Sequence, residues 1–493
     1  MTAVPEVDLF ALAPELTLLG TTLLVLFAEL ALSGPRKRLV NPLAFVGVVA
    51  ALAWVVALAA DGSTRASFGS MFVVDSYALL FKGFFLVVAA FVLFTSYRYF
   101  SEIRTYQGEY YFLLLSSFCG MLLMPSARDL VMIFIALELV SVPGFVMAGL
   151  RKFDLRSNEG ALKFFLFGVL SAAVLLFGLS IVYGFTGTTE LTGVAARLAT
   201  TEPTPLLSAS ILFVIVGFGF KVSAVPFHFW APDTYEGAPI PVTAFLSVAS
   251  KAAGFAGLLQ VCFVAFEPLA DVWAPILGVV AVLTMTLGNL VALQQRNIVR
   301  LLAYSSIAHA GYMLLPFGLA VPGDPVVNGE AFSAVLMYLL AYGVMNIGAF
   351  ACVVAVARRH PDRLVTDYAG LGQRAPALAV ALTMFLLSLG GVPPLVGLWA
   401  KAFIFLAAAT AATTFAYTLA AVMVANSVVA MFYYLYVART LWMDEPTATE
   451  PIRPGFALSA AIGGLAVTAL VVGVYPSAFA ALADVSTLVT TTP

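Results

Sequence analysis

A lysine, a histidine and a proline interrupt an apolar stretch of the chain that reads GFGFKVSAVPFHFW over residues 217–230. A second stretch, SLGGVPPLVGLWAK over residues 388–401, also combines glycines, prolines and a lysine. An interior proline removes a backbone hydrogen bond and clashes with the preceding turn, so we expect Pro226, Pro393 and Pro394 to break their helices. In hydrocarbon the freed backbone groups must be satisfied by protein or water, and such breaks usually line a cavity.

The composition is that of a membrane protein. Of the 493 residues, 62% are hydrophobic and 10% are charged, whereas soluble domains are about 45–50% apolar and about 25% charged. A helix needs roughly 20 apolar residues to cross a bilayer. We therefore predict an all-α polytopic membrane protein with about 14 transmembrane helices, over residues 9–32, 39–60, 73–96, 110–126, 129–150, 160–185, 207–230, 242–266, 272–293, 301–320, 329–357, 376–409, 415–438 and 456–475.

Several classes of function are excluded or made improbable by the residues that are missing. A net charge of −2 gives no basic surface of the kind that nucleic-acid binding needs. Cys119, Cys262 and Cys352 are far apart and form no disulfide framework or iron–sulfur spacing. The sequence has no Walker A loop, no dinucleotide fingerprint and no HExxH motif. We expect no cofactor and no metal in this chain.

Basic residues predict the orientation in the membrane. Sixteen of them fall in one set of loops, namely Arg36, Lys37, Arg38, Arg98, Arg104, Arg151, Lys152, Arg156, Arg296, Arg300, Arg358, Arg359, Arg363, Arg374, Arg439 and Arg453. The other set of loops carries three, which are Arg65, Arg128 and Arg197. The positive-inside rule places the first set in the cytoplasm and both termini on the outer side.

Five of the seven lysines lie inside predicted spans, whereas all seventeen arginines lie outside them. Lysine is the basic side chain that can lose its proton on burial, while arginine stays charged. A pathway that takes up and releases protons therefore favours Lys221, Lys251 and Lys401, which are mid-span. For Lys82 and Lys163 the alternative is a side chain that reaches back to the membrane surface, and we favour this interpretation for Lys82.

Glu138 is the one acid deep in a predicted span. A lone buried carboxylate would stay protonated, so Glu138 can take part in proton transfer only if it has a charged partner. Lys221 is the candidate from the same part of the chain. If the charge of Glu138 moved toward another cation such as Lys163, Lys221 would release its proton. The alternative is a static ion pair.

His228 and His309 also fall mid-span or near a break. Because imidazole both donates and accepts, these histidines could form a lateral relay with the lysines; the alternative is hydrogen-bonded packing. We expect the tyrosines of residues 433–436 to form an aromatic packing or interface cluster. We place Glu15 and Asp75 at the membrane interface, because both lie near span ends.

An internal repeat is visible in the spacing of the breaks. Pro226 and Pro393 are 167 residues apart, and two sets of five spans are offset by about the same distance. Because five is odd, the second set is inverted relative to the first, as in transporters built from inverted repeats. We divide the single membrane domain (1–493) into three N-terminal helices (1–109), a first five-helix repeat (110–266), a second (272–440) and a C-terminal helix (441–493).

Residues 221–239, which read KVSAVPFHFWAPDTYEGAP, and residues 243–251 closely resemble the antiporter-like membrane subunits of respiratory complex I. Residues 108–141 and the APEL sequence at 13–16 resemble the subunit N type of bacterial NADH–quinone oxidoreductase. The resemblance covers nearly the whole chain. It implies fourteen helices, among them two inverted five-helix bundles, with the seventh and twelfth helices broken.

The resemblance implies that Glu138, Lys221, Lys251 and Lys401 carry proton translocation. A lysine at the last position is similar to subunits N and L and differs from subunit M, where glutamate is typical. Around the second break, Gly397-Leu-Trp replaces the more usual Gly-Phe.

The implied function is proton pumping by a membrane-arm subunit in a bacterial cell (inner) membrane. Electrons would pass from NADH through FMN and iron–sulfur clusters to quinone in other subunits. The expected partners are antiporter-like M-type and small K-type subunits, with no nucleic acid. The main alternative is a subunit of a multi-subunit cation/proton antiporter; a membrane hydrogenase or formate-oxidising complex and a purely structural spacer are further ones.

Overall fold

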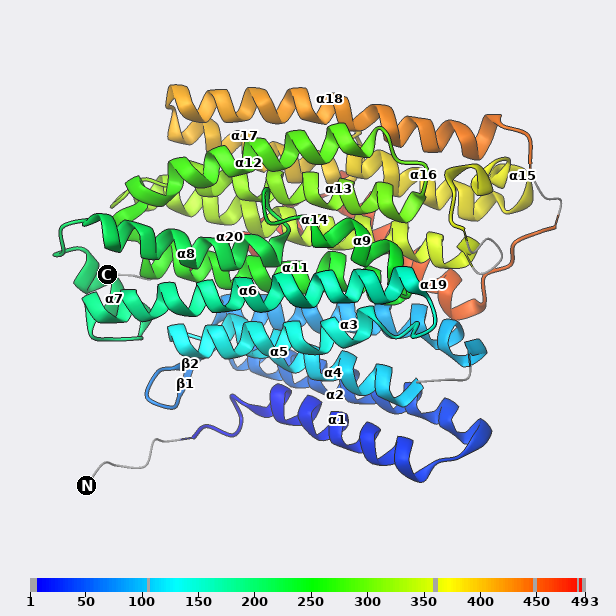
Figure 1. Ribbon diagram of the computed structural model, residues 1–493, viewed down its shortest axis with the longest axis horizontal. Coiled ribbons are helices and arrows are strands. Elements are labelled where there is room, and N and C mark those ends of the chain that lie inside the picture. Colours follow the sequence, from blue (N-terminus) through cyan, green and yellow to red (C-terminus); the bar gives the residue numbers. More distant parts are fainter. Residues whose placement is uncertain (1–6, 104–106, 358–361, 447–449, 486, 490–493) are drawn as a thin grey trace.

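The computed structural model describes residues 7–103, 107–357, 362–446, 450–485 and 487–489. Its long helices run side by side, roughly along the longest axis of the molecule (Figure 1). Three positions of the predicted cytoplasmic set, Arg104, Arg358 and Arg359, lie outside the described residues.

Twelve helical segments of the described chain are long and apolar enough to cross a membrane. Eleven of them contain one long helix each: α1 (Ala13–Ala31), α2 (Val40–Asp61), α3 (Ser76–Ile103), α5 (Leu130–Ala148), α6 (Leu155–Thr186), α8 (Pro205–Val222), α12 (Ala270–Ala292), α13 (Ile298–Leu314), α14 (Pro325–Ala357), α18 (Thr414–Met443) and α19 (Phe456–Val474). The twelfth is the composite segment Ile240–Ala265, and α4 (Gln107–Leu123) is a further apolar helix of 17 residues. Shorter helices are α7 (Leu191–Leu198), α9 (Trp230–Gly237), α10 (Ile240–Phe245), α11 (Lys251–Gln260), α15 (Leu371–Arg374), α16 (Pro376–Gly390), α17 (Val396–Ala411) and α20 (Ser477–Val485). The predicted all-α polytopic membrane fold is confirmed.

Both proline-rich stretches interrupt a helix. The first break separates α8, which ends at Val222, from α9, and contains Pro226. The second separates α16 from α17 and contains Pro393 and Pro394. Each first half ends on a residue in the left-handed conformation, Ser223 (φ 63°) or Gly391 (φ 93°), and this reversal of the backbone is a common way to terminate a helix.

The core lies around three spans that are almost fully buried in the described chain: residues 240–265, 298–319 and 325–357. The first of these is irregular, because π-helical turns over Leu246–Ser250 and Val261–Ala265 flank α11. Lys251 directly follows the first π-helical turn. Such turns are frequent at functional sites.

The end of the molecule that carries few basic residues is covered by short elements. A hairpin of β1 (Arg65–Ser67) and β2 (Phe72–Val74) lies at the same end as α7, and α15 lies at the opposite end (Figure 1). Phe72 forms an antiparallel bridge with Ala127, which joins the hairpin to the turn between α4 and α5. These contacts place the hairpin over the starts of α3 and α5.

Gly397 is required by the close approach of the two halves of the second break. A β-carbon at this position would lie 1.7 Å from the carbonyl oxygen of Ser388. We expect Gly397→Ala to destabilise the protein by about 1–3 kcal/mol, the usual cost of overpacking, and to lower the melting temperature of the solubilised protein. Gly463→Ala is the matched control, because its β-carbon meets no atom within 4 Å; equal melting temperatures for the two variants would contradict the prediction.

Candidate functional site

Polar side chains, buried in the core except at the two ends, form a row that crosses the molecule from α5 to α17. We call it the polar row; it comprises Glu138, Ser141, Lys221, Lys251, Ser306, His309, Tyr434 and Lys401. The row begins where the end of α8 meets α5. The Lys221 ammonium, on a residue that is 3% exposed, donates a hydrogen bond to Ser141 Oγ at 2.9 Å. Ser141 lies three residues after Glu138 and therefore on the same face of α5.

Glu138 is half-buried and lies on the outer face of the chain. No ion pair or hydrogen bond links its carboxylate to Lys221 in the part of the chain that the structure describes. The two charges interact through space, with Ser141 beside them. This arrangement differs from the static ion pair that the sequence left open.

Lys251 continues the row from α11 to α13. Gly254, one turn further along α11, is so close to α8 that a β-carbon there would lie 2.8 Å from Lys221 Cγ. The Lys251 ammonium donates to the Ser306 carbonyl oxygen at 2.6 Å and also to its hydroxyl. The Tyr342 hydroxyl donates to the same Ser306 hydroxyl at 2.9 Å. Lys251 is thus held in a site built from oxygen acceptors.

His309 lies one turn after Ser306 on α13, and both of its ring nitrogens have hydroxyl partners. Nδ1 is 2.8 Å from the Tyr338 hydroxyl, and Nε2 is 3.1 Å from the Tyr434 hydroxyl. The Tyr434 hydroxyl also lies 2.6 Å from Ser305 Oγ. Because hydroxyls and imidazole each donate and accept, these contacts are compatible with either tautomer of the ring.

Lys401 ends the row beside the second helix break. Its ammonium donates to the Gly390 carbonyl oxygen at 2.8 Å and lies 5.1 Å from the centre of the Tyr312 ring. Gly390 is the last residue of α16, so its carbonyl is one that the interrupted helix leaves without an intrahelical partner. The break therefore supplies the acceptor that holds Lys401 in the membrane.

Two predicted relay residues lie away from the row. The Lys163 side chain is 38% exposed and pairs with Glu159 and Asp233, each at 2.6 Å. The contact between Lys163 and Glu138 that the sequence suggested is therefore not formed in the described chain. Asp233 also binds Arg300 at 2.7 Å. His228 lies in the first break, 4% exposed and with its ring 4.5 Å from that of Phe229.

The structure corrects the placement of two residues. Lys82 is fully buried and pairs with Glu15 at 2.8 Å, so neither side chain reaches out to the membrane surface. Of the two alternatives for the tyrosine cluster, packing holds for Tyr433 and Tyr434, which are buried with their ring centres 4.4 Å apart, whereas Tyr436 is 47% exposed. The prediction for Lys82 failed because it used only the distance of this residue from the end of the span. In the structure, Glu15 of α1 and Phe72 of the hairpin lie against the Lys82 side chain.

The sequence-based prediction of the site did not include the hydroxyl groups in and beside the polar row, which belong to Ser141, Ser306, Tyr338, Tyr342 and Tyr434. The two serines lie three residues from Glu138 and His309, respectively, and this spacing places each pair on one helix face. That signal was available in the sequence. The tyrosines come from α14 and α18 and carry no comparable local pattern.

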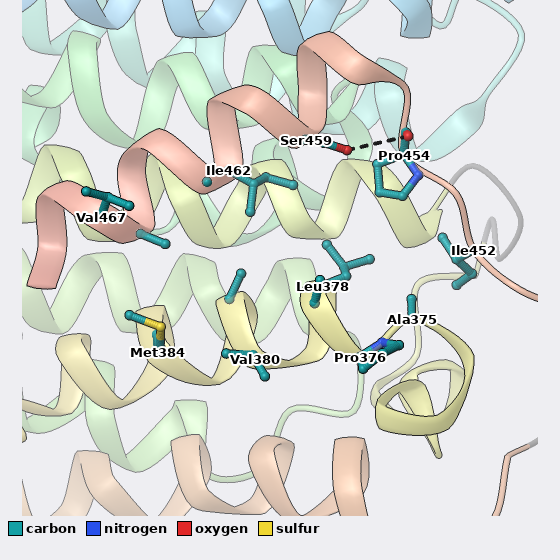
Figure 2. A pocket seen from close by; sticks show the side chains of 14 residues that line it. Ala375, Pro376, Leu378, Val380, Met384, Ile452, Pro454, Ser459, Ile462 and Val467 are labelled. Atoms are coloured by element: carbon teal, nitrogen blue, oxygen red, sulfur yellow. Dashed lines mark hydrogen bonds between the residues drawn. The ribbon is translucent and has the colours of Figure 1, made fainter.

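A large apolar cavity lies apart from the polar row. Figure 2 shows this groove of about 560 Å³ between α16 and α19, lined by apolar side chains except for Ser459. The Ser459 hydroxyl donates a hydrogen bond to the Pro454 carbonyl oxygen at 3.5 Å. The described residues contain no cluster of His, Cys, Asp or Glu suited to a metal ion, and the three cysteines are buried and unpaired by disulfide. The polar row itself offers ammonium, carboxylate, imidazole and hydroxyl groups.

Comparison with known proteins places this arrangement in a family. Residues 127–429 match the family model described as NADH:quinone oxidoreductase/Mrp antiporter, TM. The chain is 42% identical over 91% of its length, and 85% of the relative's, to NADH-quinone oxidoreductase subunit N 2 of Streptomyces griseus. It is 41% identical to subunit N 1 of Koribacter versatilis, covering 97% of this chain and 96% of that one.

Solved structures agree with the sequence relatives. A chain of respiratory complex I from Thermus thermophilus with bound aureothin superposes with a TM-score of 0.79 at 31% identity, over 96% of this chain and 99% of that chain. A chain of an archaeal membrane-bound sulfane sulfur reductase (TM-score 0.84, 23% identity, 97% and 98% coverage) shares the fold. Since the family model matches more than half of the chain and the relatives exceed 40% identity over nearly all of it, the chain belongs to the NADH:quinone oxidoreductase/Mrp antiporter transmembrane family.

Proposed function

We propose that this chain is the subunit N of an NADH–quinone oxidoreductase and translocates protons in the membrane arm of that complex. The observation that carries the proposal is the polar row, in which three lysines, two of them buried, a histidine and a carboxylate follow one another across the middle of an apolar protein. Intramembrane ionisable groups are costly and usually mark ion pathways. The names of the relatives support the same assignment.

In this mechanism the charge of Glu138 controls the proton on Lys221. While the carboxylate is charged and near, it favours the protonated lysine; when its charge is neutralised or withdrawn, the desolvated ammonium gives up its proton. Lys251, His309 and Lys401 then pass the proton along the row. Each of these groups has a hydroxyl or carbonyl oxygen already in place for the charged form.

Lys163, His228 and the two helix breaks have supporting roles. The breaks at Pro226 and at Pro393-Pro394 free backbone groups next to Lys221 and Lys401. Lys163, bound to Asp233 near the basic end of the molecule, modulates the first half of the row. We also propose that residues 110–266 and 272–440 act as two related half-channels, each with one break.

The chain is one subunit of a multi-subunit membrane complex. Glu138 shares its face of α5 with four apolar residues that are 48–56% exposed, namely Val131, Ile135, Val142 and Val146. An acid on a lipid-facing surface is unfavourable, so a neighbouring subunit suits this face better than lipid. We propose a small K-type subunit and an antiporter-like M-type subunit as the neighbours.

The reaction itself takes place elsewhere in the complex. We propose that NADH, FMN, the iron–sulfur clusters and quinone are bound by other subunits, and that this chain supplies only the proton path. Its place is the inner membrane of a bacterial cell, with the basic end in the cytoplasm and both termini outside, because cytoplasmic loops are rich in lysine and arginine.

A subunit of a cation/proton antiporter is the second candidate, because the fold also matches a chain of the Mrp complex from Dietzia (TM-score 0.77, 21% identity, 97% of this chain and 96% of that one). A native gel of mildly solubilised membranes distinguishes the two. We expect the chain to migrate with NADH dehydrogenase activity in a large assembly. Migration in a smaller assembly without that activity would favour the antiporter, and sodium-dependent proton exchange would then be measured.

A further inference from the structure

We propose that Glu15 and Lys82 form a second proton-exchanging pair, built into the three N-terminal helices and separate from the polar row. The inference rests on the proposed function, since it adds a proton-carrying site to the same translocating subunit. The pair joins α1 to α3 near the end of the molecule that carries few basic residues.

The geometry of the pair permits direct proton transfer. Lys82 Nζ lies 2.8 Å from Glu15 Oε1, with the lysine side chain 0% exposed and the glutamate side chain 8% exposed. The Lys82 ammonium also lies 4.7 Å from the centre of the Phe72 ring. This separation is within the reach of a charge-assisted N–H···O bond, although the two groups are not aligned as one in the described chain.

The pair is poorly satisfied for a structural ion pair. Within the described residues, neither carboxylate oxygen of Glu15 has a hydrogen-bond partner in good geometry, and neither has Lys82 Nζ, although Nζ and Oε1 are 2.8 Å apart. A buried ion pair stabilises a protein only when further hydrogen bonds satisfy its remaining lone pairs and protons. Unfilled acceptor and donor positions on two buried, titratable groups are what an exchange site for protons or water would leave open.

An apolar cover separates the pair from the nearest surface. Ala11, Leu58, Phe72 and Val74, each at most 2% exposed, form a small buried cluster, and its Phe72 ring contacts Lys82. The hairpin that carries Phe72 is fastened to the N-terminal segment, because Asp8 N donates to Ser67 Oγ at 2.9 Å. Phe72 is thus the residue that closes the pair off from the hairpin side.

Polar contacts connect the surroundings of the pair to the helix of Lys251. Asp75 directly precedes α3, seven residues before Lys82, and its carboxylate binds Arg128 at 2.6 Å. Arg128 also donates to Gln260, the last residue of α11, whose first residue is Lys251. Asp75 and Arg128 are the further charges that act on Lys82, so a change in the charge of the row can reach the pair through fixed groups.

In each exchange cycle the pair releases one proton and takes up one proton. Lys82 starts as an ammonium and Glu15 as a carboxylate. Transfer of the proton from Nζ to Oε1 gives the neutral amine and the carboxylic acid. Glu15 then releases that proton to water beyond the apolar cover, and the Lys82 amine takes up another from the side of Asp75 and Arg128, which restores the starting state.

Lys82→Arg separates proton exchange from a structural role. Arginine keeps the charge and the ion pair with Glu15 but does not release a proton. We expect Lys82→Arg and the neutral pair Glu15→Gln/Lys82→Met to lose as large a share of the protons pumped per NADH oxidised as Lys221→Ala loses in the same membranes. The matched control is Glu29→Gln/Lys37→Met, which removes the ion pair at the other end of α1 and should pump as the wild type does.

The outcomes are separable from those of the proposed function. Wild-type pumping by an assembled Lys82→Arg complex overturns this inference, provided that Lys221→Ala pumps poorly. Failure of all variants of the pair to assemble assigns Glu15 and Lys82 a structural role and overturns it equally. Wild-type pumping by Lys221→Ala overturns the proposed function instead, and a defect confined to the variants of the pair would then assign proton transport to the N-terminal helices alone.

Discussion

Lys221→Ala is expected to reduce NADH-driven proton pumping at least about tenfold, a conservative figure for the loss of a positioned proton-transfer group. Lys221 lies between α5 and α11, the first two helices of the polar row. Its ammonium binds Ser141 on α5, and its aliphatic stem packs against Gly254 on α11. Alanine removes the titratable group from that junction. Pumping is measured by the quenching of a pH-sensitive dye in inverted membrane vesicles supplied with NADH.

Two further variants make this prediction specific. Lys221→Arg keeps a positive charge that does not leave at any physiological pH, and we expect it to pump as poorly as Lys221→Ala. Lys152→Ala removes an exposed lysine from the loop after α5 and should pump normally. Assembly is checked on a native gel. Normal pumping by an assembled Lys221→Ala complex would exclude Lys221 from the pathway.

Glu138→Gln is expected to cause a loss of pumping of similar size. Glutamine keeps the shape of the side chain and removes the charge that acts on Lys221. The carboxylate has no hydrogen-bond or ion-pair partner among the described residues, so the substitution breaks no contact within this chain. The effect should therefore appear in pumping and not in assembly.

The control for Glu138→Gln is an acid in a comparable helix but outside the row. Glu159 on α6 has a side chain that is 63% exposed and pairs with Lys163, and exposed ion pairs contribute little. We expect Glu159→Gln membranes to pump nearly as well as wild-type membranes. If Glu138→Gln also pumps normally, the charge of Glu138 does not control Lys221.

Features that depend on local sequence were predicted well. The apolar runs correspond to the observed helices, and both proline-rich stretches are breaks. The physical reason is that hydropathy and the missing amide of proline act within a few residues of the chain. The choice of Lys221, Lys251 and Lys401 as mid-span lysines also required only their distance from the ends of the apolar runs.

Features that depend on neighbouring helices were predicted poorly. Lys82 lies six residues into α3, and by sequence its side chain could reach the membrane surface. Packing by α1 and the cover that includes Phe72 enclose it with Glu15 instead. Tyr434 could not be distinguished from an interface tyrosine until α18 was placed beside α13, where its hydroxyl meets His309.

The sequence by itself determined that this chain spans a membrane, where its helices break and which lysines lie in the middle of its apolar runs. These properties follow from the free energy of placing each short segment in hydrocarbon, which depends on the residues of that segment alone. Only the tertiary structure decided which of the buried groups meet. The hydrogen bonds of Lys221, Lys251, His309 and Lys401 each join helices or helix segments that are distant in sequence or separated by a break, and their partners are set by how those elements pack.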